Sequence, residues 1–172
     1  VQVLDNLLLL ARLDPEQKES LAKTKFDFSL LMRDVMKALQ PFSDSKQIKI
    51  NVVLAEQVYI LANEQLLFSA LRNLLDNAIR YSPEQAQVFV NLTIEKQQLR
   101  LRIENSGNGV DATVIQRLGE RFYRALGTKT QGSGLGLSIC QKIVDLHAGQ
   151  LLFSSSDLGG LKVELLLNRV EA

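Results

Sequence analysis

The stretch Gly132-Ser133-Gly134-Leu135-Gly136-Leu137 says more about the fold than any other part of this sequence. It follows a polar loop at 124–131 and opens an apolar segment with helical periodicity at 135–146, so it predicts a loop that leads into a helix. The unpaired N–H groups at the start of a helix, together with its dipole, bind phosphate. Glycines let the backbone come close to such a ligand. Taken alone, the stretch fits a phosphate site and an ordinary glycine-rich turn about equally well.

A long helix with two stacked asparagines is predicted upstream, at 64–81, where apolar residues recur at helical spacing. Asn73 and Asn77 lie four residues apart and share the polar side of this helix, which Arg80 and Tyr81 continue one turn later. Asparagine oxygens can ligate Mg²⁺ when a triphosphate supplies the charge, and arginine donates to phosphate oxygens. By themselves, the two asparagines are more simply interpreted as solvated side chains.

The other apolar patterns predict a sheet with helices on one side. We expect a helix from the capping residue Ser29 to Leu39, closed by Pro41, and Gly149 just after the last helix. Alternating residues predict three hairpins, formed by 48–54 with 58–62, by 88–94 with 99–105, and by 151–155 with 161–167. The predicted fold class is α+β, a two-layer sandwich with a mixed sheet of about five strands and three main helices on one face.

Four motifs in a fixed order resemble the ATP-binding domain of bacterial sensor histidine kinases, in the GHKL superfamily. Residues 73–83 are similar to the N box of that family, 105–109 to its first glycine box, 120–124 to its F box and 132–137 to its second glycine box. The resemblance covers essentially the whole chain. It implies the Bergerat fold, in which the nucleotide lies between the helix layer and a lid, here at about 122–133.

The resemblance implies ATP and Mg²⁺ as ligands and a role for each site residue. Asn77, with Asn73 beside it, is expected to bind the metal, and Arg80 and Tyr81 to contact phosphates or ribose. Lys129 is expected to reach the γ-phosphate, although a solvated loop lysine is an equally good interpretation. The expected ATP-binding residues are Asn73, Asn77, Arg80, Tyr81, Asn105, Gly107, Gly109, Phe122, Tyr123, Arg124, Lys129, Gly132, Ser133, Gly134, Leu135, Gly136 and Leu137.

Asn105 departs from the family pattern, which has an aspartate there to accept from the adenine amine. Strand alternation places Asn105 on the inner face with Leu101 and Ile103, whereas Glu104 points the other way and cannot replace it. Asparagine keeps one acceptor oxygen, so adenine recognition stays open. Because a charged acceptor bonds more strongly than a neutral one, Asn105→Asp is expected to tighten ATP binding about fivefold.

The phosphoacceptor is missing from this chain. Its only histidine, His147, lies at the end of the last predicted helix and lacks the acidic residue and threonine of the family's acceptor motif. We interpret it as a histidine whose charge the helix dipole favours, so no catalytic residue is expected here. The only cysteine, Cys140, falls on the apolar face of that helix and is expected to be a small buried side chain.

Length and composition place further limits on the chain. With 172 residues it fits one domain and a short appendage, and its formal net charge of +1 suggests neither nucleic acid nor an anionic membrane as a partner. We expect the end of a dimerisation and phosphoacceptor helix at 1–15, a linker at 16–25 and the ATP-binding domain at 26–170. No apolar run has the length of a membrane span, and the start at Val1 suggests a fragment.

The resemblance implies an ATP-dependent protein histidine kinase of a two-component system, which passes the phosphoryl group to a histidine of its own bundle and then to a response regulator. The implied full-length protein is a homodimer through the bundle, anchored in the bacterial inner membrane with this domain on the cytoplasmic side. The domain itself is expected to contact no membrane. The alternative is a degenerate, nucleotide-responsive interaction module of the same fold.

Overall fold

A computed structural model gives the fold, and it describes residues 21–107 and 135–171. The expected helix at 1–15, the first half of the linker (16–20) and the lid at 122–133 lie outside the described residues. In chain order the described elements are β1 (Thr24–Asp27), α2 (Phe28–Ser45), β2 (Lys49–Leu54), β3 (Tyr59–Ala62), α3 (Glu64–Arg80), β4 (Gln87–Glu95), β5 (Gln98–Ser106), α5 (Leu135–Leu146), β6 (Gln150–Ser155) and β7 (Gly159–Asn168).

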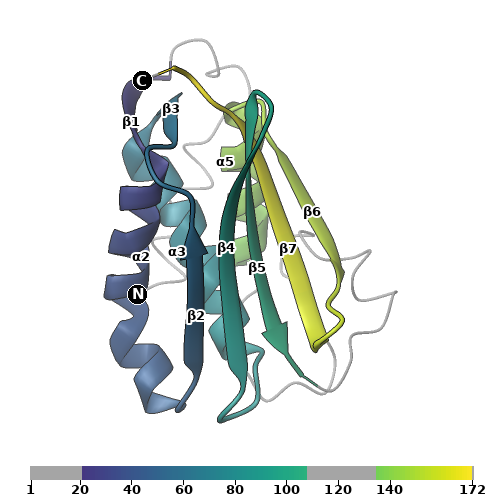
Figure 1. The fold of residues 1–172 in the computed structure, drawn as a ribbon. Helices are drawn as coiled ribbons and strands as arrows, with labels where there is room; N and C mark the ends of the chain where they lie inside the picture. The colour runs from purple at the N-terminus through teal and green to yellow at the C-terminus, as the bar shows by residue number, and fades with distance from the viewer. Residues whose placement is uncertain (1–20, 108–134, 172) are drawn as a thin grey trace.

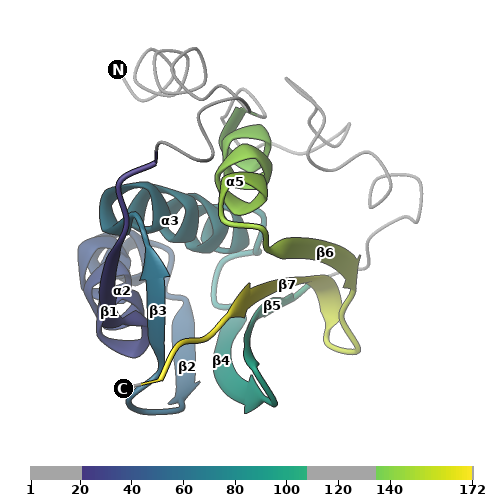
Figure 2. The ribbon, with the colours of Figure 1, turned by 90° about the horizontal axis from the view of Figure 1, so that it is seen from above.

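The main sheet has five strands in the order β2-β4-β5-β7-β6. Strands β2 and β4 run parallel, and the other neighbours are antiparallel, so the sheet is mixed. Helices α2, α3 and α5 form one layer over a single face of this sheet (Figures 1 and 2). The predicted α+β sandwich is thereby confirmed. None of the described helices has the length and apolar character needed to cross a membrane.

The core lies between the two layers and follows the predicted alternation. On β5, Leu99, Leu101 and Ile103 are at most 1% exposed, while the residues between them face the other side. Leu71 and Leu75 of α3 are fully buried against this inner face. Burial on this scale stabilises the fold by roughly 25 cal/mol for each Å² of apolar surface removed from water, and it holds α3 firmly over the sheet.

The predicted hairpin of 48–54 with 58–62 is wrong. Strand β2 instead pairs parallel with β4, and β3 pairs with β1 in a separate two-stranded sheet, visible beside α2 in Figure 2. Asp27 explains the choice, because its carboxylate accepts from the backbone N–H of Val58 at 3.2 Å and the backbone N–H of Phe28 donates to the carbonyl of Val58 at 2.7 Å. These bonds dock the start of β3 onto the end of β1.

Helix α2 also differs from the prediction at both ends. It begins at Phe28 because Asp27, rather than Ser29, is the cap and accepts from the backbone N–H of Ser29 at 2.9 Å. It continues through Pro41 to Ser45. The fully buried Ser43 holds this last turn in place, and its hydroxyl donates to the carbonyl of Gln40 at 3.0 Å.

The end of α5 shows why Gly149 is a glycine. We expect Gly149 just after the helix, but the residue with left-handed backbone there is Ala148, with a φ of 55°. A Cβ on Gly149 would lie 2.6 Å from the carbonyl oxygen of Leu166, so the glycine permits close packing against β7. The predicted hairpins of β4 with β5 and of β6 with β7 are both confirmed.

Candidate functional site

Helix α3 carries the asparagines on which the expected site depends. Its N-cap is Asn63, whose side chain accepts from the backbone N–H of Leu66 at 3.0 Å, and the helix ends at Arg80. Asn77 is half-buried, whereas Asn73 is only 6% exposed, so the prediction of a solvated face is wrong for Asn73. No side-chain hydrogen bond joins either residue to the described part of the chain. Their polar atoms are therefore not used by the described fold.

Arg80 is held along the last turn of α3. Its Nε donates to a carboxylate oxygen of Asp76 at 2.9 Å, one turn back on the same helix. The guanidinium also lies over the ring of Phe42, 5.2 Å from the ring centre, in a cation–π arrangement with α2. The side chain remains 37% exposed. These contacts fix the direction of a permanent positive charge beside the two asparagines.

Lys46, which sequence analysis missed, binds the end of α3. Its Nζ donates to the carbonyl oxygens of Ile79 at 2.8 Å, Arg80 at 3.0 Å and Ser82 at 2.8 Å. Burial lowers the pKa of Lys46; the charge of Glu84 opposes this shift and that of Arg80 adds to it. In the sequence, a lysine between a helix and a strand gives no signal, because it looks like any solvated loop lysine.

Asn105 lies inside the molecule, as predicted, but its amide is already used. Its Oδ1 accepts from the backbone N–H of Leu161 at 2.9 Å, and its Nδ2 donates to the hydroxyl of Ser82 at 3.0 Å. The orientation of the amide follows from the first bond, because the opposite one would set an NH₂ group against the N–H of Leu161. Oδ1 is also crowded by Gly160, where a Cβ would lie 2.7 Å away. The oxygen expected to accept from adenine therefore points into β7.

Gly107 packs against the turn between β6 and β7. Its N–H donates to the carbonyl of Leu158 at 3.3 Å. Gly159 has a φ of +96°, and a Cβ there would lie 2.2 Å from the carbonyl oxygen of Gly107. No residue with a side chain fits at Gly159, so this pair of glycines lets the end of β5 lie directly on the hairpin.

The helix predicted after the second glycine box is confirmed as α5. Leu137 and Ser138 in its first turns are buried, and the thiol of Cys140 donates to the carbonyl of Ala70 on α3 at 3.1 Å. Burial raises the pKa of Cys140, as expected for an inert thiol. The other expected site residues lie outside the described residues or have side chains that are not described, namely Gly109, Phe122, Tyr123, Arg124, Lys129, Gly132, Ser133, Gly134, Leu135 and Gly136.

His147 is a structural residue that joins α5 to α3. Its Nδ1 bonds the carbonyl of Ile143 at 2.7 Å, and its Nε2 accepts from the backbone N–H of Asn63 at 3.1 Å. An accepting Nε2 requires a neutral ring with its proton on Nδ1. Burial is the main cause of a lowered pKa for His147. The expected helix-dipole stabilisation of a charged ring is therefore wrong, and a ring engaged on both sides is poorly placed to accept a phosphoryl group.

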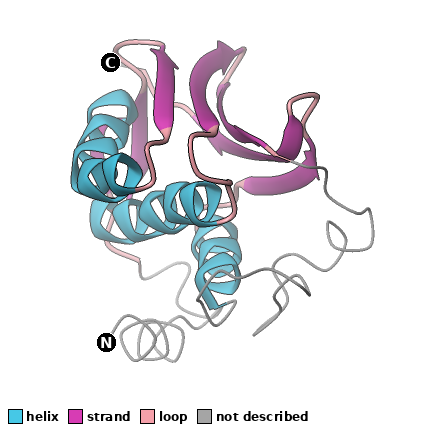
Figure 3. Cartoon of the chain, turned by 90° about the horizontal axis from the view of Figure 1, so that it is seen from below, coloured by secondary structure: helices cyan, strands magenta, loops and turns pink. Residues whose placement is uncertain are grey.

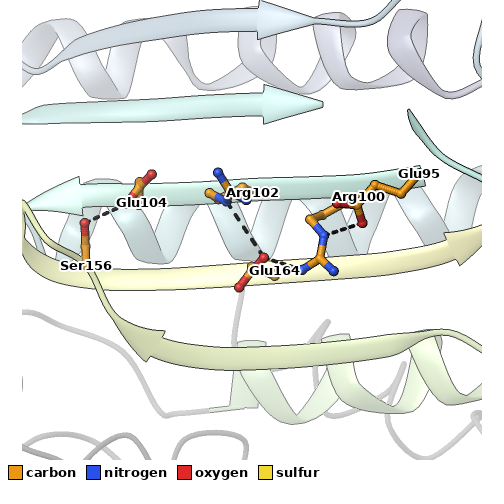
Figure 4. A network of polar contacts seen from close by, with 6 residues as sticks. All are labelled: Glu95, Arg100, Arg102, Glu104, Ser156 and Glu164. Carbon is orange, nitrogen blue, oxygen red and sulfur yellow. Dashed lines mark hydrogen bonds and ion pairs between the residues drawn. The ribbon is translucent and has the colours of Figure 1, made fainter. Parts of the chain in front are cut away.

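The outer face of the sheet carries a polar network (Figure 4). Arg100 bonds Glu95 at 2.7 Å and Glu164 at 2.5 Å. Farther along the same face, the hydroxyl of Ser156 donates to Glu104 at 2.6 Å. The prediction that Glu104 points away from Asn105 is thereby confirmed, and Glu104 cannot supply the carboxylate that the inner face lacks.

The chemistry of the donor set limits which metal site the chain can form. No group of three or more His, Cys, Asp or Glu side chains comes together within 21–107 and 135–171. The asparagine oxygens of α3 are neutral. They fit a hard cation such as Mg²⁺ only if a ligand such as a triphosphate brings the negative charge.

Residues 62–171 match the family of histidine kinase-, DNA gyrase B-, and HSP90-like ATPases. Sensor protein QseC of Escherichia coli strain K12 is 37% identical over 168 residues, which cover 95% of this chain and 36% of QseC. The chain thus spans just over a third of the length of this relative.

Solved structures agree with this match. The catalytic domain of histidine kinase ThkA is 26% identical with a TM-score of 0.77, over 86% of this chain and 95% of that domain. The complex of ThkA with response regulator TrrA shares the fold at a TM-score of 0.74 and 21% identity, over 86% of this chain and 42% of that one. Figure 3, which views the molecule from below, shows the helices on one side of the sheet. This chain belongs to the histidine kinase-, DNA gyrase B-, and HSP90-like ATPase family.

Proposed function

We propose that this chain is the ATP-binding catalytic domain of a two-component sensor histidine kinase. The observation that carries the proposal is the polar side of α3, where Asn77 and Asn73 have no side-chain bond to the described residues and Arg80 is fixed one turn away. This arrangement lies in a chain of the ATPase family that is similar to QseC over 95% of its length.

In this proposal α3 and the start of α5 hold Mg·ATP. Asn77, with Asn73 beside it, ligates Mg²⁺, which neutralises the phosphate charge when bound. Arg80 and Tyr81 orient the phosphates or ribose. The helix N-terminus at Leu135–Leu137 presents backbone N–H groups to the phosphates. The only histidine of the sequence, His147, has both ring nitrogens in hydrogen bonds, so in this proposal the domain positions ATP for transfer to another domain.

The whole protein would then be a homodimeric kinase. The phosphoryl group passes to a histidine on the dimerisation bundle, of which residues 1–15 are the last part, joined by the linker 16–25 to the catalytic domain 26–170. A response regulator receives it next, a partner type that the ThkA–TrrA complex illustrates for ThkA. In this proposal the protein is anchored in the inner membrane with this domain on the cytoplasmic side, and the similarity to a protein named as a sensor, QseC, supports the sensor role. Nucleic acid is not a proposed partner.

Two experiments test the proposal. Calorimetric titration with ATP should show binding that requires or is strengthened by Mg²⁺. With γ-labelled ATP, the chain alone should gain no acid-labile, base-stable label, and an added bundle domain with an acceptor histidine should become labelled slowly, because no tether raises its local concentration. Absence of ATP binding, or stoichiometric label on His147, would refute the proposal.

A further inference from the structure

The last turn of α3 is held by a residue outside every motif of the resemblance. An α-helix leaves four carbonyl groups unpaired at its end, and these are usually satisfied by a cap or by water. Here Lys46, from the connection between α2 and β2, donates to the carbonyls of Ile79, Arg80 and Ser82. An ammonium group has three donors, so all of them point to a single segment of four residues.

We infer that Lys46 is a positioning residue for the nucleotide site, where it fixes the segment 79–82 and thereby Arg80 and Tyr81. The inference rests on the proposed function. Its first support is the chemistry of the contact, since a positive charge at the negative end of the helix dipole, bonded to converging carbonyls, sets the backbone direction there.

The second support is that neighbouring contacts fix the same segment. Phe42, from the same end of α2 as Lys46, packs under the guanidinium of Arg80 at 5.2 Å. Asn105 holds Ser82 from the sheet side, and the Ser82 hydroxyl donates to the carbonyl of Ala78 at 2.5 Å. The segment is thus tied to α2 on one side and to β5 on the other, and Lys46 is the residue that binds its backbone carbonyls.

The third support is that Lys46 forms no ion pair with the described residues. None of the described carboxylates lies within ion-pair distance of its Nζ, although Glu84 is near enough to act on its pKa. A lysine kept only for solubility would extend into water. This one instead gives up solvation for three carbonyl oxygens, which fits a positioning role.

The test compares Lys46→Met with the parent chain and with Lys37→Met, an exposed lysine of α2 as matched control. Affinities for Mg·ATP and for adenosine are measured by calorimetry, and folding is checked by circular dichroism at the same temperature. Because adenosine lacks the phosphates that Arg80 contacts in the proposed function, Lys46→Met should weaken Mg·ATP binding by roughly tenfold and change adenosine binding much less. Lys46→Arg, which keeps the charge, should restore most of the affinity, and Lys37→Met should match the parent.

Two outcomes overturn the inference. Unchanged Mg·ATP affinity in a destabilised Lys46→Met variant would show that Lys46 serves stability alone. An equal loss for ATP and adenosine would show a general loss of the site rather than misplaced phosphate contacts. The parent titration separates these from failure of the proposed function, because a parent that binds no ATP refutes that function without reference to Lys46.

Discussion

The two asparagines of α3, Asn73 and Asn77, differ from Asn105 at the end of β5 in the hydrogen bonding of their side chains. Asn73 and Asn77 have no side-chain bond to the described residues, whereas Asn105 bonds Leu161 with its oxygen and Ser82 with its nitrogen. The resemblance assigns all three to the same ATP site. From this comparison we propose that α3 supplies the ligand contacts and that Asn105 supplies the frame around them.

The largest effect is expected from Asn77→Ala. Loss of the oxygen proposed to ligate Mg²⁺ should weaken Mg·ATP binding by about a hundredfold, while the free energy of unfolding changes by less than about 0.5 kcal/mol because no described bond is lost. Calorimetry and urea denaturation measure the two quantities. Asn51→Ala, on the edge strand β2, is the control. Parent-like Mg·ATP affinity in Asn77→Ala would remove this residue from the metal site.

Asn105→Ala should show the reverse pattern. The partly buried N–H of Leu161 would be left without its acceptor, and the Ser82 hydroxyl would lose its donor. We expect the free energy of unfolding to fall by about 2–3 kcal/mol, as measured by urea denaturation. ATP binding should weaken far less than in Asn77→Ala once the fraction of folded protein is taken into account. A variant as stable as the parent would mean that the Asn105 bonds do not support the frame.

A third prediction uses the pH dependence of stability to test His147, another side chain whose polar atoms are already hydrogen-bonded within the fold. Its folded pKa is lowered mainly by burial, so protonation favours the unfolded chain, whose histidine has a pKa of about 6.5. The contribution is fully present above about pH 6.5 and is lost as the pH falls through the folded pKa. The melting temperature should therefore decline on acidification in this range, and His147→Gln should reduce that decline. An identical pH dependence in both proteins would contradict the neutral, doubly bonded ring.

Sequence analysis predicted the features that depend on local patterns. Helix α3, the β4–β5 hairpin and the inward direction of Asn105 all follow from periodicity, and all are confirmed. Sequence analysis did not predict the contacts between segments that are far apart in the chain. The pairing of β3 with β1 depends on Asp27, and the Lys46 contact joins residues more than thirty positions apart. Neither contact can be predicted from the spacing of residues in the sequence.

The hydrogen bonds of the Asn105 side chain could not be predicted for the same reason, because they join distant parts of the sequence. Alternation gives the face on which a side chain lies, but not which atoms its amide meets. The oxygen left open for adenine in the sequence argument is used by the N–H of Leu161, a residue 56 positions away. Local pattern thus predicts which residues belong to the proposed site, whereas tertiary contacts show that Asn105 already bonds the surrounding fold.

The smallest effect is expected from Asn105→Asp. The bond from Leu161 survives, but a carboxylate oxygen would replace the Nδ2 that donates to Ser82 and, at 3.3 Å, to the carbonyl of Ser106. We expect ATP affinity to change by less than about twofold, with the same result for an inosine nucleotide, as measured by calorimetry. The fivefold tightening for ATP alone that the sequence suggests would show that Oδ1 does reach adenine.

The most direct test follows the side-chain amides themselves. In a ¹⁵N-labelled chain, NMR resolves the NH₂ signals of Asn73, Asn77 and Asn105, which single-residue variants assign. On addition of Mg·ATP, the signals of Asn77 and Asn73 should shift strongly, and that of Asn105 should stay near its position in the free protein. A shift of Asn105 as large as that of Asn77, or no shift of Asn77, would contradict the division between ligand contacts and frame.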